Sequence, residues 1–313
     1  MPTEPIASVE AIPTVSVGLP VFNGENYLAE AVKSILDQTF GDFELIICDN
    51  ASTDRTEEIA RRFAALDKRV RYHRNATNIG GARNQKLAVD LSRGRYVRLA
   101  AHDDLIAPTF LEECVRELEK RPDAIICFSG TIVIDEDGNQ VSTYQSTRGS
   151  ADRPSKRFAE LAFRVHNCDA IYGVMRTDVL RRTRPLGNYI DADKVFLSGL
   201  AMKGRFHVLD RPLFYKRFHP KNYVADWRDR MAWFNPDKKG KPSLPNWLEL
   251  RDFVRMVATA KIPLRERLLC ACVVAAWAVR YSPQLSKDLF VFGRVMLSPS
   301  RRKGTPSGIY NWE

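Results

Sequence analysis

From residue 14 onward, short runs of β-forming residues alternate with segments of helical periodicity, and this alternation constrains the fold more than any other feature. The run "TVSVGLPVF" predicts a strand. The next segment, "ENYLAEAVKSILDQ", predicts a helix, because Leu28, Val32, Ile35 and Leu36 recur on one helical face. A near-continuous apolar run, "FELIICDN", then predicts a strand that is buried on both faces.

The alternation continues to about residue 144. Asp54 and Glu57 form a helix-start signal, and Asp137, Gly138 and Asn139 form a turn signal between two strands. The intervening segments, in order, are "STDRTEEIARRFAAL", "VRYHRN", "GARNQKLAVDL", "YVRLAA", "PTFLEECVRELEKR" and "AIICFSGTIVIDEDGNQVSTY". Strands that alternate with helices imply right-handed crossovers, so we expect an α/β protein with a mostly parallel sheet flanked by helices.

Polar residues follow three of the predicted strands at the point where each strand ends. These are residues 20–23, then Asp49 and Asn50, then residues 102–104. Ligands of parallel sheets bind at the carboxyl ends of the strands. We therefore expect these side chains to converge on one edge of the sheet and to form the functional site.

The net charge favours an anionic partner. The chain of 313 residues carries a formal charge of +10 and has a pI near 9.4. Such a balance suits nucleic acid, a phosphate-bearing small molecule or an acidic membrane surface. Zinc-finger spacing and RNA-binding aromatic signatures are absent from the sequence, so we do not expect a nucleic-acid partner. The glycine patterns of dinucleotide-binding dehydrogenases and of P-loop enzymes are also absent.

The cysteines and the apolar runs indicate where in the cell the protein works. None of the six cysteines has Cys-x-x-Cys spacing, and several lie in apolar runs, which is typical of buried thiols in a reducing compartment. The N-terminal segment lacks the apolar run of a secretory signal, and no stretch reaches the ~18 apolar residues of a membrane span. We expect a cytoplasmic protein that works in the cytoplasm or at the inner face of the membrane.

Two adjacent carboxylates, Asp103 and Asp104, stand directly after a predicted buried strand in "YVRLAAHDDLIAP". They repel each other unless water, a cation or a substrate relieves their charge. A divalent cation suits the position, because magnesium takes one or two protein carboxylates and completes its shell with water and phosphate oxygens. Alternatively, the two acids cap the helix that starts near Pro108, although a cap needs only one acid.

Three segments together resemble a known family. "VSVGLPVFNGENYLAEAVKSILDQTFGDFELIICDNASTDRT", "NIGGARNQKL" and "RLAAHDDLIAP" are similar to the successive motifs of family 2 glycosyltransferases. The resemblance covers about residues 13–220. It implies a Rossmann-like GT-A fold and inverting transfer of a sugar from a nucleotide diphosphate donor, a UDP-sugar, to the hydroxyl of a carbohydrate or lipid-linked acceptor. It also implies a bound Mg²⁺ or Mn²⁺ and a role in the synthesis of cell-surface polysaccharide or glycolipid.

The same resemblance assigns residues to the donor and to the metal. Asp49 is implied to read the base, and the metal motif, usually Asp-x-Asp-Asp, begins here with Ala101 and so lacks its first acid. The metal ligands are then Asp103, Asp104 and His219. The implied nucleotide-sugar residues are Pro20, Phe22, Asn23, Glu25, Asp49, Asn50, Ser52, Asn78, Gly80, Arg83, His102 and Asp103.

The catalytic base is expected in "GNYIDADKVFLSGLAMKGRF". The family carries a Glu-Asp pair there, which makes Asp191 the first candidate, with Ile190 in place of the Glu, and Asp193 the second. A positioned carboxylate would deprotonate the acceptor hydroxyl. Alternatively, Asp191 is only an acid favoured by the helix macrodipole. Near the end of the predicted strand "RPLFYKRFHPKN", Lys216 and Arg217 would add positive charge near the diphosphate, or would be a solvated basic strand end.

The chain is expected to divide into three parts: a flexible tail (1–12), a glycosyltransferase domain (13–220, with a nucleotide-binding half 13–110 and an acceptor half 111–220) and a helical extension (221–313). The extension has three interpretations: packing onto the transferase domain, a homodimer contact, or a basic amphipathic surface on a membrane. Two other functions stay open, a sugar nucleotidyltransferase and a non-catalytic binder of nucleotide-sugar or nucleic acid.

Overall fold

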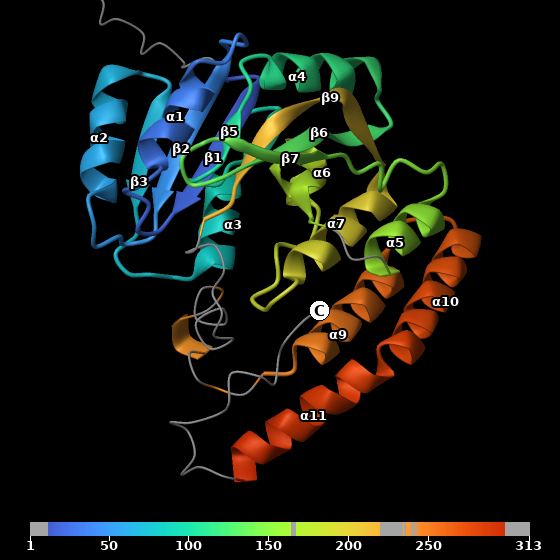
Figure 1. The fold of residues 1–313 in the computed structure, drawn as a ribbon. Helices are drawn as coiled ribbons and strands as arrows, with labels where there is room; N and C mark the ends of the chain where they lie inside the picture. The colour runs from blue at the N-terminus through green and yellow to red at the C-terminus, as the bar shows by residue number, and fades with distance from the viewer. Residues whose placement is uncertain are drawn as a thin grey trace, which may run out of the picture.

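A nine-stranded sheet forms the centre of the molecule in the computed structural model, which describes residues 12–163, 167–219, 234, 236–238, 241 and 243–297 (Figure 1). Its strand order is β3-β2-β1-β4-β8-β6-β9-β5, and β7 pairs with β6. The strands are β1 Val15–Val21, β2 Phe43–Asp49, β3 Val70–Arg74, β4 Tyr96–Leu99, β5 Leu105–Ile106, β6 Ala124–Ile134, β7 Gln140–Tyr144, β8 Val174–Arg176 and β9 Arg205–Arg217.

Most strands run in one direction. β3, β2, β1 and β4 are parallel to one another. β8 is antiparallel to both β4 and β6, so β6 and its parallel partner β9 point the same way as β4. Only β5, β7 and β8 of the described strands run in reverse. The expected mostly parallel sheet is confirmed, and the carboxyl ends of β1, β2, β4, β6 and β9 share one edge.

Helices cover both faces of the sheet, because alternate residues of the buried strands are apolar on both sides. On one face, Leu45 and Ile47 of β2 belong to a core that includes residues of α1 and α4. On the other face, Ile46 and Cys48 belong to a core with residues of α3 and α7. The helices of this part are α1 Leu28–Leu36, α2 Thr56–Leu66, α3 Gly81–Leu91, α4 Phe110–Lys120, α5 Pro154–Phe163, α6 Thr177–Arg181 and α7 Ala192–Lys203, with a 3₁₀ turn η1 at Asp169–Tyr172.

The start of α2 differs from the sequence prediction. The helix begins at Thr56, and Asp54 lies before its N-cap, Arg55. One oxygen of Asp54 accepts the Thr56 backbone N–H at 3.0 Å, and the other accepts the Glu25 backbone N–H at 3.0 Å. The acid therefore ties the start of α2 to the loop that precedes α1, which is a loop of the expected site.

The C-terminal extension packs onto the part of the molecule that contains the sheet, through a third apolar core. It contains η3 Pro236–Lys238, α9 Pro245–Thr259, α10 Leu264–Arg280 and α11 Ser282–Leu297. Phe253 of α9 lies 5.4 Å from the ring of Phe158 in α5 and 5.6 Å from that of Trp277 in α10. Val195 of α7 joins this core. The packing interpretation thus holds for the inner face of the extension, whereas residues 1–11 of the expected tail lie outside the described residues.

Candidate active site

Asp49 lies fully buried at the end of β2 and holds three neighbours in place. Its Oδ1 accepts the Ser52 backbone N–H at 2.8 Å. Its Oδ2 accepts the Tyr72 hydroxyl and the Arg74 Nη1, each at 2.7 Å. Because both oxygens are already engaged, Asp49 organises the carboxyl ends of β2 and β3, and its reading of a base stays a prediction.

Asn50 connects the end of β2 to the start of α3. Its Nδ2 donates to Asn78 Oδ1 at 2.8 Å, and its Oδ1 accepts the Ile79 backbone N–H at 2.9 Å. Asn78 Oδ1 also accepts the Gly80 backbone N–H at 2.9 Å. Gly80 has φ = 86° at the N-cap of α3, a left-handed conformation that favours glycine. The two predicted segments are therefore brought together.

The loop after β1 joins this network. Asn23, with φ = 53°, donates its backbone N–H to Ser52 Oγ at 3.0 Å and accepts the Thr53 N–H through Oδ1 at 2.8 Å. A Cβ added to Gly24 would lie 2.7 Å from Cδ2 of His102, so the same loop packs against the segment after β4. The loops after β1, β2 and β4 therefore form one continuous edge, as expected.

Asp103 and His219 meet at this edge although 116 positions separate them. His219 Nε2 lies 3.2 Å from Asp103 Oδ2, with both side chains largely buried. The ring of Tyr27 lies 4.9 Å from that of His219, and His102 Nδ1 lies 4.0 Å from Asp103 Oδ1. The structure thus pairs two of the three predicted metal ligands.

Asp104 faces β9 rather than open space. Its Oδ1 accepts the Arg217 backbone N–H at 2.9 Å, and the residue is 8% exposed. Burial raises the pKa of Asp104 well above its usual value, and the negative charge of Asp103 adds to this effect, while the Arg217 N–H and Lys216 oppose it. The two neighbouring acids therefore have separate partners, and a metal role for Asp104 stays a prediction.

Arg217 has a structural role that the sequence did not indicate. Its side chain is 1% exposed, because an aromatic ring and hydrogen-bond partners cover the guanidinium. The guanidinium donates to the Asp103 carbonyl at 3.1 Å, to the Glu136 carbonyl at 3.0 Å and to Glu30 at 2.7 Å. Arg217 thus clamps the segment that carries Asp103. The sequence contained one feature from which this role could have been predicted. Side chains alternate along an extended chain, so Arg217 and His219 lie on the same side of it.

Lys216 points to a different partner, and that partner was also missed. Its Nζ lies 2.9 Å from Asp169 Oδ1. Asp169 Oδ2 accepts the hydroxyls of Thr131, at 2.9 Å, and of Tyr144. The positive charge of Lys216 is therefore matched by Asp169 within the fold.

The two candidate bases occupy different environments at the start of α7. Asp191, with φ = 66°, is the exposed N-cap residue. Asp193 lies in the first turn, and its Oδ1 accepts the Lys194 backbone N–H at 2.9 Å. Burial, and then the charge of Asp191, raise the pKa of Asp193 above its usual value.

Several acids of this region affect the pKa of the Tyr172 hydroxyl. Burial raises its pKa most, and the negative charges of Asp104, Asp103, Asp169 and Asp193 raise it further. The negative charges of Asp103 and Asp193 therefore both act on Tyr172.

The donor set at Asp103 and His219 suits a hard divalent cation. In the part of the chain that the structure describes, no group of three or more His, Cys, Asp or Glu side chains is placed to hold a metal ion. One carboxylate and one imidazole nevertheless fit a cation that takes its remaining ligands from water and substrate phosphates. The residues present are therefore compatible with Mg²⁺ or Mn²⁺ bound together with a diphosphate.

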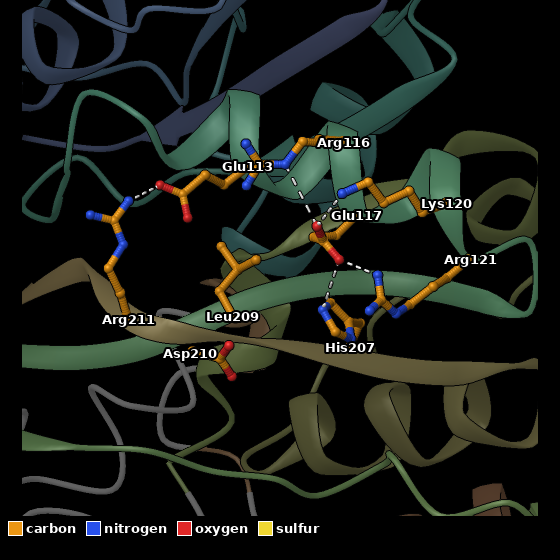
Figure 2. A pocket seen from close by; sticks show the side chains of 9 residues that line it. All are labelled: Glu113, Arg116, Glu117, Lys120, Arg121, His207, Leu209, Asp210 and Arg211. Atoms are coloured by element: carbon orange, nitrogen blue, oxygen red, sulfur yellow. Dashed lines mark hydrogen bonds and ion pairs between the residues drawn. The ribbon is translucent and has the colours of Figure 1, made fainter.

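A surface hollow of about 570 Å³ between α4 and the first half of β9 is a separate feature (Figure 2). Figure 2 shows Glu117 at its centre, paired with Arg121, Lys120 and Arg116 and facing His207. Its basic groups are matched by carboxylates, and it adjoins the start of β9, whereas His219 follows the end of that strand. We do not include it in the candidate site.

Known proteins resemble this chain in sequence and in fold. The profile described as "Glycosyl transferase family 2" matches residues 16–184. An uncharacterised glycosyltransferase from Methanocaldococcus jannaschii is 32% identical over 156 residues, which cover 49% of this chain and 54% of that protein. Chondroitin synthase from Escherichia coli is 35% identical over 137 residues, or 44% of this chain and 20% of the synthase. The chain thus spans about half or less of the length of these relatives.

Solved structures show the same fold at low identity. S. aureus TarS 1–349 in complex with UDP-GlcNAc has a TM-score of 0.64 at 17% identity, over 89% of this chain and 80% of that one. The mannosyltransferase PcManGT from Pyrobaculum calidifontis, in complex with GDP-Man and Mn²⁺, has a TM-score of 0.53 at 17% identity, over 96% and 85%. The fold is therefore of the GT-A type, as the sequence predicted.

Proposed function

Because the chain belongs to glycosyl transferase family 2, we propose that it moves a sugar from a nucleoside diphosphate donor, a UDP-sugar, to an acceptor hydroxyl with inversion. The observation that carries the proposal is the contact between Asp103 and His219 at the edge where the parallel strands end. Chondroitin and hyaluronan synthases are among the relatives, which favours an acceptor used in cell-surface polysaccharide or glycolipid synthesis, either a carbohydrate or a lipid-linked sugar.

The nucleotide would lie along the loops after β1 and β2 and at the start of α3. The exposed side chains of Phe22 and Arg83 are available to a base and to a phosphate respectively. Asp49 would act through Arg74 and Tyr72, which it holds beside this surface. Preorganised groups of this kind bind the donor without the cost of ordering them.

Asp103 and His219 would hold Mg²⁺ or Mn²⁺ against the diphosphate. When bound, the cation offsets the negative charge that develops on the departing nucleoside diphosphate. Ala101 stands where the family usually has another acid, so the protein supplies fewer negative charges here. Arg217 would keep the Asp103 segment in place through its bond to the Asp103 carbonyl.

Asp193 is the group we assign as general base, with Asp191 tuning it. A base works best when its pKa approaches the working pH, and burial and Asp191 both raise the pKa of Asp193. Asp193 would take the proton of the acceptor hydroxyl while the acceptor oxygen bonds to the anomeric carbon. The bond between that carbon and the diphosphate oxygen breaks in the same step, and the nucleoside diphosphate leaves with its electron pair.

The protein would act on the cytoplasmic side of a membrane. In support, the six cysteines are free thiols, and five of them are buried. Free thiols are typical of a reducing compartment.

Thermal stabilisation by UDP, with and without Mn²⁺, tests the donor and metal proposals. We expect UDP to raise the melting temperature only when the cation is present, and Asp103→Asn to abolish this increase. A panel of sugar nucleotides with a broad acceptor mixture should then release UDP. Pyrophosphate release from UTP and a sugar phosphate would instead identify a nucleotidyltransferase, and binding without release from any donor would identify a non-catalytic binder.

A further inference from the structure

The outward side of α10 carries an apolar stripe. Leu264 is 60% exposed, Leu268 is 59% exposed and Val279 is 76% exposed. Together with the exposed Cys272 and Ala275 they recur every three or four residues, so they share one face of the helix. The opposite face, which packs into the extension core, contains the buried residues Cys270, Val274 and Trp277.

The next helix also carries exposed apolar residues. Leu289 and Phe290 of α11 are 51% and 69% exposed. Figure 1 shows α10 and α11 as the outermost helices on the side of the extension away from the sheet. We define the α10–α11 face by five residues: Leu264, Leu268, Val279, Leu289 and Phe290.

The charges beside this face are of one sign. Arg265, Arg280 and Arg294 are exposed on the two helices. Each helix has one acid, and both acids turn toward the protein. Glu266 pairs with Arg153 at 2.8 Å, and Asp288 accepts the Asn246 backbone N–H at 2.9 Å. An apolar stripe flanked only by cationic side chains complements a surface that is apolar within and anionic at its rim.

We propose that the α10–α11 face docks onto an anionic lipid bilayer, with both helices lying in the plane of the interface. No single described helix is long and apolar enough to cross a membrane, and the α10 and α11 pair that passes on length and composition together is bent by 59°. A second copy of the chain fits less well, because a two-fold contact would bring the same arginines face to face.

This proposal depends on the proposed function only in naming the cytoplasmic leaflet of the membrane. Its test needs neither a sugar donor nor an acceptor. The full-length protein is sedimented with phosphatidylcholine vesicles and with vesicles that also contain phosphatidylglycerol. We expect binding to the anionic vesicles that weakens as salt is raised. Leu268→Glu/Val279→Glu should lower the partition coefficient at least about tenfold, whereas Leu66→Glu, at a leucine of α2 that is 77% exposed, should leave it unchanged.

Charge and insertion are measured separately. Arg265→Gln/Arg280→Gln should weaken binding about thirtyfold, because each cationic residue near an anionic surface contributes a factor of about five. Arg62→Gln/Lys68→Gln, at exposed residues in α2 and just after it, is the matched control. An environment-sensitive fluorophore on Cys272, the one exposed cysteine, should shift to the blue with anionic vesicles. Absence of vesicle binding, equal binding by the α10 variants, or a dimer that Leu268→Glu dissociates would overturn the proposal.

Discussion

A buried ion pair joins the helix of the proposed base to the C-terminal extension. Lys194 Nζ, in the first turn of α7, lies 2.5 Å from Glu249 Oε1 of α9, and the two side chains are 16% and 6% exposed. The ammonium also lies 5.9 Å from the ring of Trp277 and 5.5 Å from that of Tyr281. Burial raises the pKa of Glu249 to about 7, with Lys194 opposing, so the pair is fully charged only above neutral pH.

Replacing one residue of the pair should lower the free energy of unfolding more than replacing both. At 2.5 Å and an effective permittivity of about 20, the attraction is about 7 kcal/mol before the cost of burying both charges is subtracted. Glu249→Gln leaves a buried ammonium without its counter-ion, so we expect the free energy of unfolding to fall by about 3 to 5 kcal/mol. Lys194→Met/Glu249→Gln should lie within about 1 kcal/mol of the wild type, because it also removes the charge that would be stranded.

Urea unfolding at pH 8 of the wild type, the two single variants and the double variant completes a thermodynamic cycle. Asp90→Asn is the control. Lys86 and Asp90 are also 2.5 Å apart but are about half exposed, and such pairs contribute less than about 1 kcal/mol. Glu249→Gln with stability equal to the wild type, or a double variant as unstable as the sum of the singles, would refute the reasoning.

The site gives four further predictions. Asp103→Asn should lower turnover at least about a hundredfold, as for other preorganised electrostatic groups. His219→Ala should raise the Mn²⁺ concentration at which UDP protects the protein in a melting assay. Asp193→Asn should abolish sugar transfer and leave the affinity for UDP nearly unchanged. Retained turnover would show that another residue is the general base. Activity should rise with pH as Asp193 loses its proton, and Asp191→Asn, by removing a neighbouring negative charge, should move this rise to lower pH in a kcat profile.

The regular half of the fold could be predicted because its signals are local. Strand and helix periods alternate from β1 to α4, and in a parallel sheet this order alone brings Asp49 and Asp103 to one edge. The sequence did not predict β5, the two-residue strand Leu105–Ile106, whose pairing with β9 is formed by residues over a hundred positions away. For the same reason the partner of Asp104, the Arg217 backbone N–H, was not predicted.

The acceptor side was less predictable. Asp169 follows a short polar segment without periodicity, and only the tertiary contact with Lys216 reveals that it neutralises a strand residue. The choice between Asp191 and Asp193 depended on burial, because spacing alone places both acids at the start of one helix. Which of them faces the core is decided by the packing of α7 against neighbouring elements, and a single sequence does not report that packing.

The family match ends at residue 184, but the Lys194–Glu249 pair and His219 lie beyond it. A chimera that grafts a new acceptor half onto this scaffold therefore cannot use the end of the match as its junction. A graft joined there would separate His219 from Asp103, its partner at the candidate site. An exchange that includes α7 should also include α9 and α10, so that Lys194 keeps Glu249 and the shared apolar core.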